Sequence, residues 1–262
     1  MEKSISKGGA YLSLTSILCV ALVRFGSGVF PLQAMLFKQE LSFSYAALAG
    51  ILFAEPFGII IGLSGASKLP DNTHCKLLQG VLIFLCGNLL TALSSNAWGF
   101  FFARTLIGLA QFLMGNTVLA DAVGKSPPQL VTVLAWHRVT AVVFLVLSPL
   151  VGGLLIAGRG AREVSYMLVF LGFFLFLLVA SFPLKCSKNT PVTGDISLKR
   201  FASATARRPA PLLALFLCGV RELLVIGAGV FVLALSGNLF VAGLTMTLLR
   251  LSFWLSKAAI SF

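Results

Sequence analysis

The chain has 262 residues, of which 58% are hydrophobic and 11% are charged, with a formal net charge of +12. This composition is typical of a protein that is surrounded mostly by lipid, and it excludes an ordinary soluble domain. The positive charge does not indicate a nucleic-acid-binding protein, because the basic residues are spread over connections between apolar stretches, where membrane orientation and anionic headgroups account for them.

Eight apolar stretches of near-bilayer length follow one another along the chain. An α-helix rises about 1.5 Å per residue, so each stretch is long enough to cross the ~30 Å hydrocarbon core of a membrane. The first stretch is expected to be retained, because it is longer than the apolar part of a signal peptide and contains Arg24. The sequence therefore predicts an all-α, polytopic transmembrane bundle with spans at residues 10–36, 45–66, 77–95, 97–123, 130–157, 164–184, 212–235 and 239–256.

Basic residues of the connections fall mainly on one side of the predicted membrane. The opposite side holds only Lys38, Arg159 and Arg162. The side of the N-terminus holds twelve, which are Lys3, Lys7, Lys68, Lys76, Lys125, Lys185, Lys188, Lys199, Arg200, Arg207, Arg208 and Lys257. Because cytoplasmic loops carry the excess of Lys and Arg, we expect a multi-pass protein of the cell (inner) membrane with both termini in the cytoplasm.

A change of composition divides the chain after the sixth stretch. Residues 1–184 are expected to form a six-helix transmembrane bundle, and residues 212–262 part of a second bundle with about two spans. Residues 185–211 are rich in Lys, Arg, Ser, Thr and Pro, which predicts a cytoplasmic linker. Within this linker, residues 196–206 are a candidate for a short amphipathic helix on the membrane surface.

Several ionisable side chains lie inside the predicted spans. A charge at bilayer depth costs at least ~2.5 to 3.5 kcal/mol on insertion scales, so each must face a partner, a cavity or water. We expect these residues to be the main functional candidates, and they are Arg24, Glu55, Arg104, Arg138, Arg221 and Glu222.

Glu55 is the strongest candidate for proton coupling. A carboxyl group in a low-dielectric site can gain and lose a proton as the site opens to each side of the membrane. The alternative is that Glu55 only neutralises Arg24 or Arg104 in a static ion pair. Pro56 follows Glu55 and is expected to free a backbone carbonyl and bend the helix.

One face of the fourth stretch carries Arg104, Gly108, Gln111 and Gly115, at positions i, i+4, i+7 and i+11. A face that mixes a cation, an amide and two small residues belongs in the interior of a bundle. It is either part of a proton or substrate relay or a packing seam with one buried ion pair.

Motifs in the fourth and fifth stretches resemble those of a known family. The fourth contains Arg104 followed by Gly108 and ends at Asp121, an acidic position in related sequences. The fifth contains Ser-Pro-Leu-Val-Gly-Gly at 148–153, similar to the Gly-Pro-x-x-Gly-Gly antiporter motif, with a Ser in place of its first Gly. Residues 20–184 thus resemble the first half of a major facilitator superfamily transporter, most closely its drug:proton antiporter branch.

The loop after the second stretch departs from the pattern of this family. Gly62 fits the Gly that usually precedes an Asp and a basic cluster, but Ala66 stands at the Asp position, and Lys68 and Lys76 are all that remains of the cluster. Such transporters have about twelve spans, six in each half. We therefore expect a complete first bundle and a truncated second one.

The resemblance implies a permease that exports a small amphipathic molecule by proton coupling. Its partners would be the lipid bilayer, the substrate and the proton, with no metal or other cofactor. Arg24, Glu55 and Arg104 would line the path, and Pro149 with Gly152 and Gly153 would shape a hinge. The alternatives are a truncated or split-gene product that does not transport alone, or a membrane partner for a second chain that supplies the remaining spans.

An enzyme is the remote alternative. Gly62-Leu-Ser64-Gly65 matches the Gly-x-Ser-Gly pattern of rhomboid intramembrane proteases, in which the Ser needs a His within hydrogen-bond reach. His74 lies in a predicted loop and His137 near the inner end of the fifth stretch, so the context argues against a catalytic pair. We expect the chain not to be an enzyme.

Overall fold

The computed structural model describes residues 2–64, 73–122, 127–181 and 209–260, and within these ranges it contains helices and no strands. Each of the eight helices coincides with one predicted span, so the all-helical, multi-pass fold is confirmed. The bounds are α1 Glu2–Leu41, α2 Tyr45–Ser64, α3 Thr73–Leu93, α4 Ala97–Ala122, α5 Pro127–Arg159, α6 Ala161–Ser181, α8 Pro209–Ser236 and α9 Leu239–Ile260. The proposed surface helix at residues 196–206 and most of the predicted linker lie outside the described residues.

Local turn chemistry explains why the helices end where they do. Three helices begin with a polar cap. The Ser44 hydroxyl accepts a hydrogen bond from a backbone N–H in the first turn of α2. The side-chain oxygens of Asn96 and Asn238 accept in the same way from the first turns of α4 and α9. Gly160 separates α5 from α6 with φ of 101°, and Gly237 separates α8 from α9 with φ of 61°. Glycine adopts such positive φ values without steric strain, and a residue in this conformation cannot continue an α-helix. Each helix therefore ends at or next to its glycine.

Six helices, α1 to α6, are long and apolar enough to cross a membrane. In α8 and α9 the described apolar segments are shorter, at Leu224–Ser236 and Leu239–Trp254. The outer surface is that of a protein in lipid, because aromatic side chains such as Phe170 and Phe174 are 61% and 53% exposed. The six-helix part of the chain is therefore a membrane-embedded bundle.

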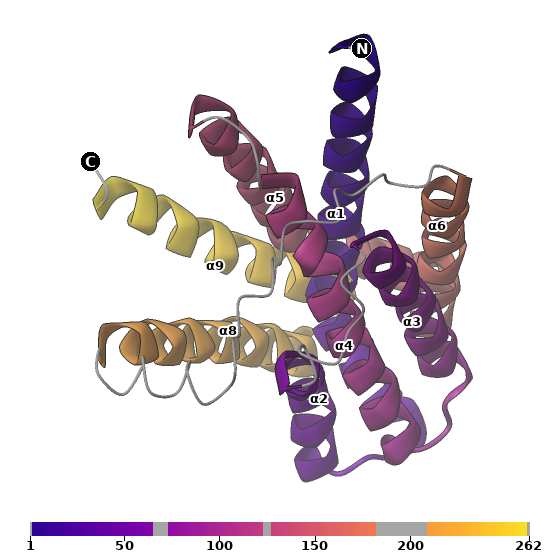
Figure 1. The fold of residues 1–262 in the computed structure, drawn as a ribbon. Coiled ribbons are helices and arrows are strands. Elements are labelled where there is room, and N and C mark those ends of the chain that lie inside the picture. The colour runs from indigo at the N-terminus through magenta and orange to yellow at the C-terminus, as the bar shows by residue number, and fades with distance from the viewer. Residues whose placement is uncertain (1, 65–72, 123–126, 182–208, 261–262) are drawn as a thin grey trace.

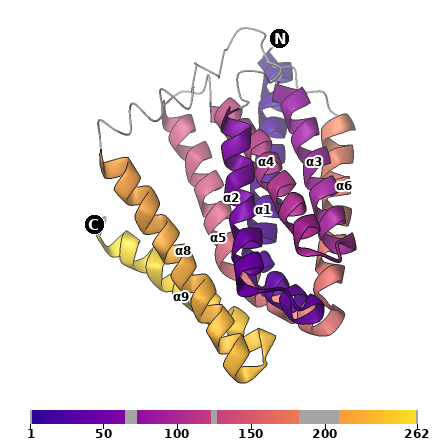
Figure 2. The same cartoon turned by 90° about the horizontal axis from the view of Figure 1, so that it is seen from below.

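The helices α1 to α6 run side by side in one bundle, and α8 and α9 form a hairpin along its flank (Figures 1 and 2). Within the bundle α4 packs against α2 and α3, α1 packs against α5, and α6 packs against α3. The hairpin is attached mainly through the contact of α9 with α5. This arrangement makes α5 the helix that joins the two parts.

Glycines bring α2 and α4 into backbone contact. A Cβ atom added at Gly58 would meet the carbonyl oxygen of Thr105 and, at 2.9 Å, the amide nitrogen of Leu109. One added at Gly108 would meet the carbonyl oxygen of Glu55, and one at Gly62 would lie 2.7 Å from the ring of Phe112. Small residues at such spacing let membrane helices approach closely, so this seam presses Glu55 against α4.

A pair of glycine substitutions on α2 tests this seam. Gly58→Ala is expected to lower the thermal unfolding midpoint of the purified protein in detergent, because overpacking a close contact costs about 1–3 kcal/mol. The matched control is Gly50→Ala, since a Cβ at Gly50 meets nothing within 4 Å. In the control the midpoint should stay or rise, because Ala is the better helix former. Equal midpoints for the two variants would contradict the seam.

Candidate functional site

A half-buried carboxylate joins three helices of the bundle. Glu55 on α2 forms a salt bridge with the guanidinium of Arg104 on α4, whose side chain is 2% exposed while that of Glu55 is 14% exposed. Its other oxygen accepts a hydrogen bond from the amide of Gln111 and one from the Ser27 hydroxyl of α1 at 2.6 Å. Among the described residues this is the one salt bridge between side chains, and we call these four residues the Glu55 cluster.

Helix geometry explains how the cluster is assembled. Arg104 and Gln111 are seven residues apart and lie on one face of α4, two turns from each other. Gly108 lies between them and has no side chain, so the backbone of α2 can rest against it and Glu55 can reach both donors. The packing seam and the relay, the two interpretations of this face, both place a charged Arg104 inside the bundle. Glu55 is the partner of that charge.

Ser27 is the adjustable member of the cluster. Its hydroxyl oxygen lies 2.6 Å from the Glu55 carboxylate and 2.9 Å from the carbonyl oxygen of Val23. It also lies 2.8 Å from the amide nitrogen of Gln111, from which it can accept. A hydroxyl has a single proton, so Ser27 can donate to the carboxylate or to its own helix but not fully to both. No sequence pattern indicated Ser27, because Ser is common in membrane helices.

The guanidinium of Arg104 is held on a second side by an aromatic ring. It lies over the ring of Phe30, 3.7 Å from the ring centre, which is a favourable cation-π geometry for a buried guanidinium. Its Nε atom is buried and has no hydrogen-bond partner. The cation therefore depends on Glu55 for its charge compensation, and removing one partner of such a buried pair costs about 3–5 kcal/mol.

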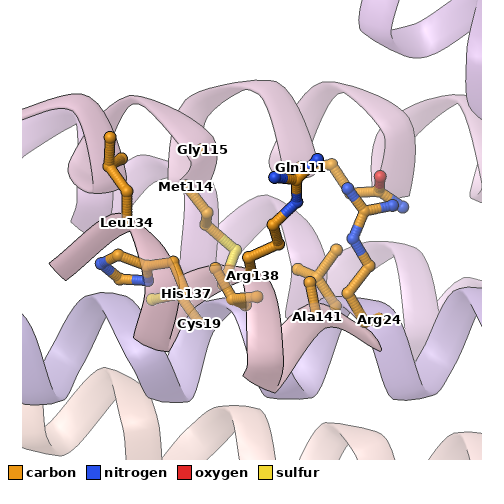
Figure 3. A pocket seen from close by; sticks show the side chains of 11 residues that line it. Cys19, Arg24, Gln111, Met114, Gly115, Leu134, His137, Arg138 and Ala141 are labelled. Atoms are coloured by element: carbon orange, nitrogen blue, oxygen red, sulfur yellow. The ribbon is translucent and has the colours of Figure 1, made fainter. Parts of the chain in front are cut away.

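A cavity of about 340 Å³ lies next to the cluster, between α1, α4 and α5. Figure 3 shows the side chains of Arg24 and Arg138 extending toward Gln111, with His137 beside Leu134 farther along the cavity. Gln111 lines this cavity and also donates to Glu55. The amide of Gln111 thus connects the cavity to the buried carboxylate. The residues lining the cavity are Cys19, Val20, Val23, Arg24, Gln111, Met114, Gly115, Leu134, His137, Arg138 and Ala141.

The Ser-Pro-Leu-Val-Gly-Gly segment at 148–153 of α5 forms the junction with α1 and α9. Pro149 has no N–H, so the carbonyl of Leu145, four residues earlier, loses its normal helix hydrogen bond. Arg250 of α9 donates to this carbonyl at 2.8 Å, and Ser148 donates at 3.1 Å. Although it carries a charge, Arg250 is only 4% exposed. A side chain from the neighbouring helix therefore satisfies the backbone group that the proline leaves open.

The two glycines of the same motif allow close helix packing. A Cβ atom at Gly152 would lie 2.6 Å from a side-chain carbon of Val29 on α1, and one at Gly153 would lie 2.8 Å from the carbonyl oxygen of Leu239 on α9. On the other side of the contact, a Cβ at Gly243 would meet the carbonyl oxygen of Pro149. Their role as a hinge remains a prediction, whereas their packing contacts are clear.

Comparison with known proteins relates the fold to membrane transporters. The chain is similar to a crystal structure of peptide transporter POT in complex with sulfate and to that of a point mutant of POT in complex with sulfate. Each match has a TM-score of 0.54 and 17% sequence identity, and it covers 87% of this chain and 50% of the transporter chain. The fold is of the major facilitator type. No family model and no curated protein matches the chain.

The likeness to POT concerns the fold, since identity is 17%, and the chain spans about half the length of the transporters that it matches. Together with the apolar helices α1 to α6, it makes the chain a multi-pass membrane protein. The resemblance to the major facilitator superfamily noted from sequence motifs is thus confirmed at the level of the fold.

The structure separates the predicted site residues into groups. Glu55, Arg104 and Gln111 meet in the cluster, while Arg24 and Arg138 line the cavity beside it. Gly62 and Gly108 lie in the seam between α2 and α4. The side chains of the two acidic candidates Asp121 on α4 and Glu222 on α8 lie outside the described residues. Arg221 lies half-buried on α8.

Arg250 is a second residue that the sequence did not indicate. It lies within the last predicted span, at 239–256, so the cost of a charge at bilayer depth was the signal that could have found it. Its partner is a backbone carbonyl on another helix, which no sequence spacing indicates.

The protease alternative gains no support from the geometry. Ser64 is exposed at the end of α2, and its hydroxyl donates to the carbonyl of Ile60 at 2.8 Å. His137 is buried on α5, where its Nε2 lies 3.4 Å from the Ser16 hydroxyl. These two side chains are therefore engaged at different places in the bundle.

A double-mutant cycle tests the junction of α5 and α9. Arg250→Met is expected to lower the unfolding free energy by about 1–3 kcal/mol, because a buried carbonyl loses a charged donor. In the Pro149→Ala background the cost should fall by about 1 kcal/mol, since the new N–H can bond to Leu145. Thermal and denaturant unfolding in detergent measure both costs. Identical costs in the two backgrounds would show that Arg250 does not serve the carbonyl that Pro149 frees.

Proposed function

We propose that the chain is a proton-coupled secondary transporter that exports a small amphipathic molecule, of the drug:proton antiporter type. The observation that supports it best is the Glu55 cluster, in which one buried carboxyl group joins α1, α2 and α4 and touches a cavity through Gln111. Ionisable groups at this depth in a membrane protein are expensive and mark ion and substrate pathways.

Protonation of Glu55 would change the contacts that hold the three helices together. The neutral carboxyl group attracts Arg104 far less than the carboxylate does, and one of its oxygens becomes a donor instead of an acceptor. Ser27 can then donate to Val23, and Gln111 is released toward the cavity. Protonation of Glu55 and binding of a substrate in the cavity would therefore each change the hydrogen bonds of Gln111. Each event would then alter the free energy of the other, which is what coupling requires.

Movement of two bundles against each other is the way in which this fold alternates access to its binding site. In our proposal α5 transmits the change, because it lines the cavity with Arg138 and contacts α9 through Gly153 and Arg250. The likeness covers 50% of the transporter chain. A second candidate function is that of a membrane partner of another chain.

The division into a bundle at residues 1–184, a linker at 185–211 and part of a second bundle at 212–262 belongs to the same proposal. It is supported by the way in which the hairpin of α8 and α9 touches the first six helices mainly through α5 and α9.

We also propose that the chain lies in the cell (inner) membrane with both termini in the cytoplasm, on the strength of the distribution of Lys and Arg. A fluorescent protein that matures only in the cytoplasm should fluoresce when fused to either end of the chain. The matched control is a fusion inserted at Gly160, in the turn between α5 and α6, which should remain dark. Fluorescence from one end only would contradict the proposed orientation.

Glu55→Gln tests the coupling role. In proteoliposomes with an imposed pH gradient, we expect gradient-driven movement of ethidium and carboxyfluorescein to fall at least about tenfold for whichever dye the wild-type protein moves. Exchange of the dye without a gradient should be retained in folded protein, because the amide keeps the shape of the carboxyl group and its oxygen can still accept a hydrogen bond. Size-exclusion chromatography separates this effect from loss of folding.

The matched control for this experiment is Glu40→Gln, an exposed carboxyl group at the end of α1. Its gradient-driven rate should equal that of the wild-type protein. If Glu55→Gln leaves the gradient-driven rate unchanged while the protein stays folded, Glu55 has no part in coupling and the static ion pair is the correct interpretation.

A further inference from the structure

Gly115 is the one glycine among the residues that line the cavity in the described part of the chain. It is exposed, and a Cβ atom added to it would meet no other atom within 4 Å. Gly108, two turns earlier on α4, differs, because a Cβ there would meet the carbonyl oxygen of Glu55 on α2. The two glycines on this face of α4 therefore have different surroundings: Gly108 touches another helix, and Gly115 borders open space.

Helix packing does not account for a glycine at position 115. Glycine inside a helix is less favourable than alanine by about 1 kcal/mol, because it loses more conformational freedom when the helix forms. In membrane helices the usual compensation is the close approach of another helix, as at Gly58 and Gly108. No described residue approaches Gly115 in this way, so the space that it leaves open belongs to the cavity.

A side chain at position 115 would cover Gln111. In an α-helix the Cα–Cβ bond tilts toward the N-terminus, so a long side chain lies over the residues three and four positions earlier. Gln111 is four residues before Gly115, and both residues line the cavity. Because position 115 has no side chain, the amide of Gln111 is open to the cavity from this side.

Larger side chains line the cavity on the side of α5. They belong to Leu134, His137 and Arg138. Figure 3 shows Arg138 extending toward Gln111, and in the same view Gly115 lies on α4 between Leu134 and Gln111. The cavity has a volume of about 340 Å³, which is that of a small-molecule site. A ligand that lies along this cavity and reaches Gln111 therefore lies against the backbone of Gly115.

We propose that Gly115 is a specificity-determining residue of this cavity, because it sets the size of the group that can reach Gln111. The proposal rests on the proposed function, since it concerns the substrate of the same transport site. It narrows the substrate to a molecule with a bulky apolar portion, which would lie against Gly115, Met114 and Leu134. The polar group of that molecule would reach Gln111.

Stability separates an open glycine position from a packed one. Gly115→Ala is expected to keep or raise the thermal unfolding midpoint of the full-length chain in dodecyl maltoside, because alanine favours the helix and its Cβ meets no neighbour. A midpoint lowered as much as that of Gly58→Ala would show that Gly115 is a packing position and would overturn the proposal.

Thiol labelling measures access to position 111 without any transport. In the full-length chain with Gln111→Cys, ethylmaleimide and the bulkier pyrenylmaleimide should both react, and peptide mass spectrometry reads the label at residue 111 alone. Adding Gly115→Leu should lower the reaction rate of pyrenylmaleimide about tenfold or more, and that of ethylmaleimide less, because the new side chain lies over residue 111.

The matched control is Gly158→Leu in the same Gln111→Cys chain. Gly158 is also exposed and has nothing within 4 Å of an added Cβ, but it lies near the end of α5 and does not line the cavity. Both labelling rates should stay unchanged in this control. Equal slowing by the two leucine substitutions, unchanged labelling in folded Gly115→Leu, or no labelling at residue 111 when Gly115 is present would refute the access role.

Transport of dye pairs tests the selectivity itself. In proteoliposomes with an imposed pH gradient, the pairs are ethidium with methylquinolinium, both cations, and carboxyfluorescein with hydroxycoumarin carboxylate, both anions. Within the pair that the wild-type protein moves, Gly115→Leu should slow the larger dye about tenfold or more relative to the smaller one, with Gly115→Ala in between. An unchanged ratio of the two rates would overturn the role of Gly115 in selectivity.

The two kinds of readout keep this proposal distinguishable from the proposed function. If Gly115→Leu slows labelling at residue 111 and no dye follows the pH gradient, the proposed transport fails and the access role of Gly115 stands. If the wild-type protein moves a dye pair, and Gly115→Leu changes neither the labelling nor the ratio of rates, the role of Gly115 fails alone. If both the labelling and the ratio change as expected, both proposals hold.

Discussion

Burial of the Arg104 and Glu55 charges in the membrane is the constraint on which the bundle depends. Neither ion can remain at that depth without the other, so α2 and α4 must meet where the two side chains meet. The contact is possible because Gly58 and Gly108 let the backbones touch. Ser27 then brings α1 to the same carboxylate, so that one acidic residue sets the relative positions of three helices.

The same rule governs the junction between the bundle and the α8–α9 hairpin. In hydrocarbon every backbone polar group needs a partner within the protein, so the carbonyl that Pro149 leaves open at Leu145 must be satisfied by another element. Arg250 does this from α9, while Gly153 and Gly243 bring the two backbones together. The segment at residues 148–153 of α5 is therefore the place where two parts of this chain are joined.

The functional proposals depend on the position of Gln111 between these two regions. It donates to Glu55 on one side and lines the cavity on the other, so a change at either place alters its hydrogen bonds. Arg138 also lines this cavity, and it lies on α5, the helix that carries Pro149. Charge, cavity and helix junction are thus parts of one connected structure.

The sequence by itself determined the eight helices and the class of the fold, and it singled out Glu55 as a charge within a span, because span length, turn residues and the cost of a charge at bilayer depth are local properties. It left open whether Glu55 pairs with Arg24 or Arg104, and it did not indicate Ser27 or Arg250 as partners. Those choices depend on how each helix is rotated and which helices are neighbours. Packing of small residues across the bundle decides both, and only the tertiary structure shows which glycine faces which backbone.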